Sequence, residues 1–343
     1  MTEDVMRSAL ELLVAGADLD HATARRVMDT IMEGSATSAQ IGALLAALRA
    51  KGETADEITG MVESMRDHAT PVTLPMDAVD TCGTGGDGAQ TFNISSAAAL
   101  VTAGAGCPVA KHGNRAASSR CGSADVFEAL GVVISLPPEG VLRCIEEAGI
   151  GFFFAPAYHP ALRHAAQARR ELGIRTVFNV LGPLANPARV RHQALGVGDA
   201  ALAPIMAAVL RRLGLHRALV FTGPDGLDEL GIAGPSQCYE VTPGGVREFS
   251  LDPRELGFEP APLWALRGGD APDNAARVCA ILEGEPGPGR DVVVLNAAAA
   301  IVAAGAASNF PEAVERARES IDSGRAKTCL TSLIAVSNRM AVG

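Results

Sequence analysis

A glycine-rich run from Val79 to Ser96, VDTCGTGGDGAQTFNISS, holds the densest set of residues suited to binding a ligand. An apolar stretch ends at Cys82, and four glycines within the next six residues let the backbone approach a ligand closely. Asn93 is placed to cap a helix that begins near Ile94. Because free backbone amides and the positive end of a helix both attract anions, this run predicts an anion-binding loop.

The same glycines also satisfy another pattern, since Gly83, Gly85 and Gly88 match the G-x-G-x-x-G fingerprint of dinucleotide-binding folds. That fingerprint needs a helix beginning within the glycines and an acidic residue at the end of the next strand. Here a polar stretch intervenes, and the next apolar strand, Pro108–Ala110, is followed by Lys111. No Gly-Lys-Ser/Thr follows the glycines, which argues against a Walker loop. For the glycines alone, a tight turn that binds nothing remains the alternative.

A second polar run, KHGNRAASS from Lys111 to Ser119, follows the strand Pro108–Ala110. It gathers two cations, an imidazole, an amide and two hydroxyls around one glycine, which suits a phosphate group. A solvated loop is the alternative interpretation. His112 by itself is more typical of a hydrogen-bonded core histidine than of a catalyst.

Two adjacent acids, Asp228 and Glu229, follow the predicted strand Ala218–Phe221 and a Gly-Pro-Asp-Gly turn. Mg²⁺ prefers a few carboxylates together with phosphate oxygens of a substrate, and such a pair can supply them. An ordinary acidic turn is the alternative, but the position at a strand end favours the metal site.

The composition restricts the class of protein that carries these runs. The chain has 343 residues, nearly half of them apolar, and a net charge of -10 without any basic run, so we expect a globular protein that binds neither nucleic acid nor membrane. The acidic N-terminus and the absence of an eighteen-residue apolar run predict a cytoplasmic location. Seven cysteines without a C-x-x-C pair indicate reduced thiols.

The elements that must position these residues divide into two units. Capping boxes at Thr37 and Thr54, each ahead of an apolar stripe, predict a small helical domain over residues 1–72, joined by helices from about 156–180. Residues 73–343 alternate short apolar runs with glycine loops and helices, which predicts a large α/β domain with a mainly parallel central sheet. Its expected strands are 78–82, 108–110, 132–134, 218–221 and 292–295.

Taken together, the motifs resemble the anthranilate phosphoribosyltransferase family. GTGGD, NIS-S/T and KHGNR occur in the family's order and spacing, and the match continues through GIGF, RRELGIRT, FNVLGPL with Asn186-Pro187, and GLDE, so that it covers essentially the whole chain. The resemblance implies the fold shared by nucleoside phosphorylases and these transferases. It also implies transfer of a phosphoribosyl group from phosphoribosyl pyrophosphate to anthranilate in tryptophan biosynthesis, with two Mg²⁺ ions and a homodimer formed through the N-terminal helices.

The resemblance also implies site residues. Those expected to bind the phosphoribosyl donor are Gly83, Gly86, Asp87, Thr91, Asn93, Ile94, Ser95, Ser96, Lys111, His112, Gly113, Asn114, Arg115, Ala116, Ala117, Ser118, Ser119 and Ser123. Those expected to bind anthranilate are Gly83, Asn114 and Arg169, with Pro156, Tyr158 and His159 along the approach for its ring. Those expected to serve the metal are Ser95, Asp228 and Glu229. We expect Lys111 and His112 at the reaction centre, with His112 as the base and the carboxylate of the substrate as the alternative base.

Two positions depart from the family pattern, and two other functions remain open. Ser96 replaces the usual threonine, and Gly231 stands where a serine or threonine commonly follows the Asp-Glu pair; neither removes a charge that the chemistry needs. A relative of the same fold that has lost catalysis or uses another acceptor should have lost Asn114 or Arg169, and both are present. A pyrimidine nucleoside phosphorylase-like enzyme should carry Lys-x-Ser in place of KHGN.

Overall fold

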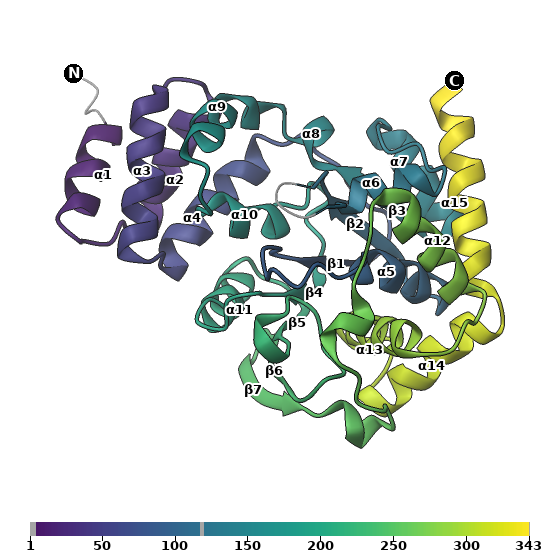
Figure 1. The fold of residues 1–343 in the computed structure, drawn as a ribbon. Helices are drawn as coiled ribbons and strands as arrows, with labels where there is room; N and C mark the ends of the chain where they lie inside the picture. The colour runs from purple at the N-terminus through teal and green to yellow at the C-terminus, as the bar shows by residue number, and fades with distance from the viewer. Residues whose placement is uncertain (1–4, 117–119, 343) are drawn as a thin grey trace.

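The computed structural model describes residues 5–116 and 120–342, so the predicted donor residues Ala117, Ser118 and Ser119 lie outside the described residues. At the N-terminal end, four helices form a bundle (Figure 1): α1 (Val5–Val14), α2 (His21–Met32), α3 (Ser38–Lys51) and α4 (Ala55–Asp67). Both predicted capping boxes are present, Thr37 with Gln40 and Thr54 with Glu57, and they set where α3 and α4 begin.

Two later helices pack on this bundle and share its core. They are α9 (Arg163–Leu172) and α10 (Phe178–Leu184), and α9 contacts both α2 and α3. The common core includes Met28, Leu44 and Met61 from the bundle together with Ala165 and Leu181 from α9 and α10. The bundle is therefore joined to the rest of the molecule by an apolar core that chain segments far apart in sequence complete.

A seven-stranded sheet with the order β3-β2-β1-β4-β5-β6-β7 forms the centre of the larger unit. The first five strands run parallel, and the last two are antiparallel at one edge. This confirms the predicted mainly parallel sheet. The strands are β1 (Val79–Gly83), β2 (Val109–Gly113), β3 (Ile150–Phe154), β4 (His192–Gly196), β5 (Arg217–Thr222), β6 (Ser236–Thr242) and β7 (Gly245–Leu251).

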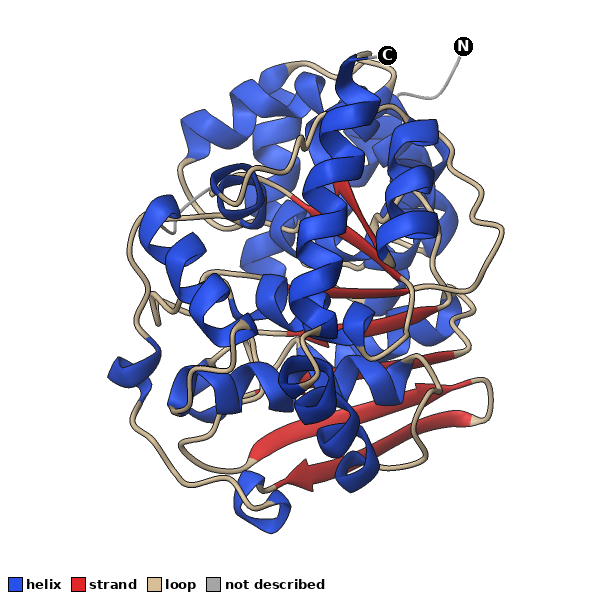
Figure 2. Cartoon of the chain, turned by 90° about the vertical axis from the view of Figure 1, so that its right-hand side faces the viewer, coloured by secondary structure: helices blue, strands red, loops and turns tan. Residues whose placement is uncertain are grey.

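Helices cover the sheet (Figure 2) and bury its apolar side chains in a second large core. Those of the larger unit are α5 (Ile94–Gly104), α6 (Ser123–Ala129), α7 (Pro138–Ala148), α8 (Ala155–Tyr158), α11 (Ala203–Arg212), α12 (Ala271–Leu282), α13 (Pro288–Ala303), α14 (Phe310–Asp322) and α15 (Arg325–Val342). Short 3-10 helices span Pro160–Leu162, Pro224–Gly226, Pro253–Leu256 and Leu263–Leu266. Among the described helices, none combines the length and the apolar character that a membrane span requires.

Two of the predicted strands were wrong, and four strands were not predicted. Residues 292–295 lie within α13, which is buried almost throughout, and an apolar run inside a buried helix cannot be told from a strand by its pattern alone. Residues 132–134 form no strand. The strands β4, β6 and β7 were missed because polar residues interrupt their apolar runs, and β3 was missed although IGFFF is a continuous apolar run. The three strands whose carboxyl ends carry the predicted site residues, β1, β2 and β5, are nonetheless all present.

Candidate active site

The glycine-rich loop connects β1 to α5 at the carboxyl edge of the sheet. A Cβ atom at Gly83 would lie 2.2 Å from Asp228 Oδ2, and one at Gly86, where φ is 74°, would lie 1.2 Å from Arg175 Nη1. These two positions require glycine because side chains from distant segments occupy the space. The loop is thus held against Asp228 on one side and against Arg175, which also donates to the Thr84 carbonyl oxygen, on the other.

The two acids expected to serve the metal meet this loop from the segment after β5. Asp228 Oδ2 accepts a hydrogen bond from the Gly85 amide at 2.6 Å, and Glu229 Oε1 accepts one from the Ser95 amide at 3.0 Å. Residues more than 130 positions apart therefore come together at the amino end of α5.

These carboxylates are costly to keep ionised. Burial, with the neighbouring charge of Asp87 added, raises the pKa of Asp228 to about 7. Burial and the charge of Asp228 likewise raise the pKa of Glu229 well above its usual range, although Lys111 opposes that shift. Crowded acids of this kind are relieved by a cation or by protonation.

The carboxylates of Asp228 and Glu229 are too few to enclose a metal ion, but they suit a magnesium ion that takes its other ligands from a bound substrate. Asp87 Oδ2 is buried and has no hydrogen-bond partner among the described residues. The described part of the chain contains no cluster of three or more acids, histidines or cysteines that could hold a metal ion without further ligands. Mg²⁺ takes one or two carboxylates plus phosphate oxygens and water, so Asp228 and Glu229 supply what such an ion needs from a protein.

Lys111 is buried beneath the loop, with 1 % of its surface exposed. Its Nζ donates to the Thr81 carbonyl oxygen and lies 3.4 Å from the hydroxyls of Thr81 and Ser95. Burial lowers the pKa of Lys111, and the charges of Asp80 and Glu229 oppose that shift. The ammonium group therefore ties β1, β2 and the start of α5 together and places a positive charge directly under the loop.

His112 is a neutral buried imidazole with one free nitrogen. Its Nδ1 lies 3.2 Å from the Gly182 carbonyl oxygen, which can only accept, so Nδ1 carries the hydrogen and Nε2 keeps a lone pair. That Nε2 has no partner among the described residues. Burial and the neighbouring His159, 5.2 Å away between ring centroids, lower the pKa of His112 to about 3.

His159 is the second histidine of this pair, and in the sequence only its place upstream of Arg169 pointed to the site. Burial lowers its pKa to about 4, and its Nε2 likewise has no partner within the described segments. Both rings lie against the end of α10, His112 beside Gly182 and His159 beside Ala185. A substrate that donates a hydrogen bond would satisfy the free Nε2 of His112, whereas the His159 ring interacts with the backbone carbonyl groups of Ala185 and Met65.

Arg115 and Asn114 of the KHGNR run bond to each other and to α6. Arg115 pairs with Asp125 and Glu128, so its charge is already balanced there. Asn114 accepts from the Arg115 amide at 2.7 Å, and the Ser123 hydroxyl donates to the Asn114 carbonyl oxygen. Lys111, His112 and Gly113 belong to β2, the neighbour of β1 in the sheet, whereas the charge of Arg115 is directed at the acids of α6.

Arg169 differs from its neighbour Arg170 in a way that the sequence did not show. Its guanidinium stacks over the Phe178 ring at 4.8 Å, and burial lowers its pKa. No acid pairs with it among the residues that the structure describes, whereas Arg170 is exposed. A half-buried arginine without a counterion is well placed to take a carboxylate.

Other residues predicted to bind the phosphoribosyl donor lie in or next to the same loop, but their own contacts differ. Thr91 forms an isolated bridge with Arg267, and Asn93 bonds to Asn274 and Cys121 instead of capping α5 with its side chain. Ile94 and Ser96 are buried at the start of α5. The residues that the structure brings to one edge of the sheet are Gly83, Gly86, Asp87, Thr91, Asn93, Ile94, Ser95, Ser96, Lys111, His112, Gly113, Asn114, Asp228 and Glu229.

Three further residues complete the site. Arg175 lines Gly86, and it was visible in the sequence only as part of the RRELGIRT run. Asp80 is fully buried, accepts from the His112 amide at 3.1 Å and from Asn186 Nδ2 at 2.9 Å, and has its pKa raised to about 6 by burial. Asn186 thereby links the segment after α10 to β1, a contact that no local pattern encodes.

Comparison with known proteins agrees with this arrangement. Residues 75–327 match the family model described as "Glycosyl transferase family, a/b domain", and residues 7–69 match "Glycosyl transferase family, helical bundle domain". A protein from Thermomicrobium roseum named anthranilate phosphoribosyltransferase is 57% identical over 339 residues, 97% of each chain.

Solved structures give the same result. The crystal structure of anthranilate phosphoribosyltransferase from Thermus thermophilus superposes with a TM-score of 0.91 at 45% identity, covering 96% of this chain and 99% of the other. The enzyme of that name from Saccharomyces cerevisiae, solved in complex with PRPP and Mg, superposes with a TM-score of 0.90 at 28% identity, covering 98% of this chain and 99% of the other.

Proposed function

The chain belongs to the anthranilate phosphoribosyltransferase family, and from this we propose that it transfers the 5-phosphoribosyl group of phosphoribosyl pyrophosphate to the amino group of anthranilate. The products are N-(5-phosphoribosyl)anthranilate and pyrophosphate, and the step serves tryptophan biosynthesis. The observation that carries the proposal is the meeting of the glycine loop, the start of α5 and the Asp228-Glu229 pair at one edge of the sheet.

The donor binds at the loop between β1 and α5. The amides of residues 86–88 and the positive end of α5 suit the pyrophosphate, while buried Lys111 adds a positive charge beneath them. Asp228 and Glu229, with the Ser95 hydroxyl, would hold Mg²⁺ ions, and two ions are the number we propose. Magnesium, when bound, stabilises negative charge on the leaving pyrophosphate.

Anthranilate binds between the KHGNR run and α9, with its carboxylate on Arg169. The stacked, unpaired guanidinium supports this assignment, and the Asn114 side chain and the Gly83 backbone complete the contact with the acceptor. A site of this kind holds the amine in line with the anomeric carbon, and such positioning lowers the barrier without a covalent intermediate.

The transfer requires one bond to break, one to form and one proton to leave. The bond between the anomeric carbon and oxygen breaks with its electron pair going to pyrophosphate, and the amine lone pair forms the new C–N bond. The free Nε2 of His112 is placed to accept the proton as the bond forms. Because burial lowers the pKa of His112 to about 3, the ring is a weak base, and the proton goes from it to solvent.

We further propose that the chain acts as a cytoplasmic homodimer that pairs through the helical bundle. Leu12 and Val14 on α1 support this, because they are large apolar side chains that are 43% and 80% exposed. Sedimentation equilibrium of wild-type protein against Leu12→Glu should show a dimer only for the wild type. A wild-type monomer at micromolar concentration would contradict the pairing.

The proposed reaction is tested by measuring pyrophosphate release. With Mg²⁺ and phosphoribosyl pyrophosphate, anthranilate should release one pyrophosphate per anthranilate consumed, and 4-aminobenzoate, whose carboxylate cannot reach Arg169 in the same pose, should not. Calorimetry in the presence of Mg²⁺ separates binding from turnover. Failure of folded protein to take up phosphoribosyl pyrophosphate would overturn the proposal.

A further inference from the structure

A pocket of about 570 Å³ lies at the opposite, amino edge of the sheet, away from the candidate active site. Its walls come from α4, from the residues just before β4 and from those between α11 and β5. Five arginines and one histidine line it, against two acids: Arg25, Arg66, Arg189, Arg191, Arg212 and His216, with Glu63 and Asp67. In a chain whose net charge is -10, this concentration of positive charge is unusual.

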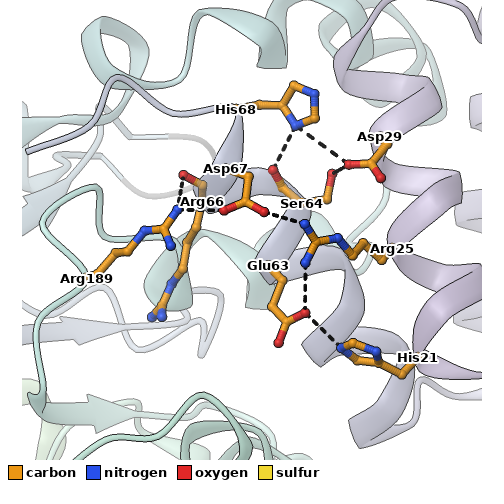
Figure 3. Close-up of polar contacts among 9 residues, drawn as sticks. All are labelled: His21, Arg25, Asp29, Glu63, Ser64, Arg66, Asp67, His68 and Arg189. Atoms are coloured by element: carbon orange, nitrogen blue, oxygen red, sulfur yellow. Dashed lines mark hydrogen bonds and ion pairs between the residues drawn. The ribbon is translucent and has the colours of Figure 1, made fainter.

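The two acids of the pocket are already neutralised. Arg25 bridges Glu63 and Asp67, and His21 also contacts Glu63 at 2.9 Å (Figure 3). Arg189 adds a bond of 2.7 Å to the other oxygen of Asp67. The remaining arginines of the pocket therefore find no free acid within its wall.

Arg66 and Arg191 are the cations left over. The Arg66 Nε donates to the Leu184 carbonyl oxygen at 2.8 Å, but its two terminal nitrogens have no partner among the described residues. In Figure 3 its guanidinium lies apart from the chain of ion pairs. Arg191 contacts only the His216 ring, at 3.2 Å, and pairs with no acid in the part of the chain that the structure describes. Arg212 is partly engaged, because its Nη1 lies 3.1 Å from the exposed carboxylate of Asp56, outside the pocket.

Two more features show that the protein holds these cations together at a cost. Arg189 has a φ of 47°, in the left-handed region that a side chain of its size rarely adopts. Burial and the nearby charge of Arg189 lower the pKa of Arg66 to about 10, so like charges are held close in a partly dry place. An anion bound between them would relieve both the repulsion and the unmade hydrogen bonds.

From this geometry we propose that the amino-edge pocket binds a small phosphate-bearing molecule between Arg66, Arg191 and Arg212. The three guanidinium groups come from α4, from the residue before β4 and from the end of α11. Three guanidinium groups from three separate segments can each donate to one of the three outward oxygens of a phosphate group, whereas a carboxylate offers only two oxygens. The volume of the pocket lies within the range of small-molecule sites.

The test uses full-length protein, inorganic phosphate as the probe and calorimetry without Mg²⁺. Arg191→Gln and Arg66→Met should each weaken the phosphate affinity by about tenfold, the loss expected for a charged hydrogen bond. Arg211→Gln, an exposed arginine beside Arg212 that does not line the pocket, should bind as the wild type does. Asp228→Asn, changed at the other edge, should also keep this uptake.

The location and the class of anion are tested separately. Diffraction from crystals soaked in selenate should give an anomalous peak among Arg66, Arg191 and Arg212. Arg191 is exposed, so its variant should fold even if Arg66→Met does not. Phosphate affinity unchanged in Arg191→Gln, or no selenate peak in the pocket, would overturn the site. Malonate that binds as tightly as phosphate would overturn the phosphate assignment.

Discussion

The carboxyl and amino edges of the same sheet gather charge in opposite ways. At the carboxyl edge, backbone amides and half-buried acids surround the glycine loop, and Asp228 and Glu229 have raised pKa values. At the amino edge, arginine side chains line an open pocket whose acids are already paired. A protein can thus bind an anion through a metal ion held by acids, or directly through arginine side chains. The first arrangement leaves crowded carboxylates when the metal is absent, and the second leaves unpaired guanidinium groups.

We expect the largest effect on activity from removing an acid at the carboxyl edge. Glu229→Gln should lower kcat by about 10²-fold or more, because magnesium and its stabilisation of the leaving group depend on that carboxylate. Asp225→Asn is the matched control, since Asp225 is exposed in the same loop and Asn tolerates its φ of 57°. Initial rates at saturating Mg²⁺ decide the matter, and equal rates for the two variants would argue against the metal role.

Arg169 and Arg170 offer the next largest effect, because only the first is stacked, half-buried and without a counterion in the described part of the chain. Arg169→Gln should raise the KM for anthranilate by roughly 10- to 100-fold while the KM for the donor stays nearly constant, as expected for the loss of a charged hydrogen bond. Arg170→Gln should leave both values within about twofold of the wild type. Similar KM values for the two variants would remove Arg169 from the acceptor site.

Substitutions at Gly86 and Gly88 distinguish the effect of a side chain that contacts Arg175 from the effect of backbone strain alone. Both have positive φ, so alanine at either should cost about 1 kcal/mol in stability. Only Gly86→Ala places a methyl group against Arg175, while nothing lies within 4 Å of the same position at Gly88. We expect the KM for phosphoribosyl pyrophosphate to rise about tenfold in Gly86→Ala alone. Equal KM values would show that Arg175 need not stay where it is.

His112 tests whether the free nitrogen at the carboxyl edge takes part in proton transfer. His112→Ala should lower kcat by at least about tenfold, which is less than the 10²- to 10⁴-fold that a positioned base usually contributes because the pKa of His112 is so far below neutral. Turnover within about threefold of the wild type would remove the base role and favour the carboxylate of the substrate. Single-turnover kinetics would separate this loss from slower product release.

The smallest effect concerns stability, and it contrasts a buried histidine with an exposed one. Since the folded pKa of His159 is lowered to about 4, the unfolded chain binds a proton first, and stability is lost as the pH falls from about 6.5 towards 4. His159→Asn should therefore lose about 2 kcal/mol less than the wild type between pH 7 and pH 5 in urea unfolding. His216→Asn, which changes an exposed histidine at the amino edge, is the control variant in the same urea unfolding.

Local patterns in the sequence were enough to indicate the elements around the candidate active site. The capping boxes at Thr37 and Thr54 are present, and so is the order strand, glycine loop, helix around Gly83–Ile94. Such signals are local because a cap or a turn is satisfied within a few residues. The strand predicted at residues 292–295 failed for the same reason, because an apolar run does not say whether a helix or a strand buries it.

Local patterns thus identified β1, the glycine loop and α5, together with the residue types that follow β1, β2 and β5. Which of those residues face one another became clear only in the folded chain: Arg175 fills the space beside Gly86, Asn186 bonds to Asp80, and Arg66 and Arg191 share a pocket. The physical reason is that pairing charges and filling space depend on distances between segments about 90 or more residues apart, and these distances exist only once the sheet has set the order of its strands.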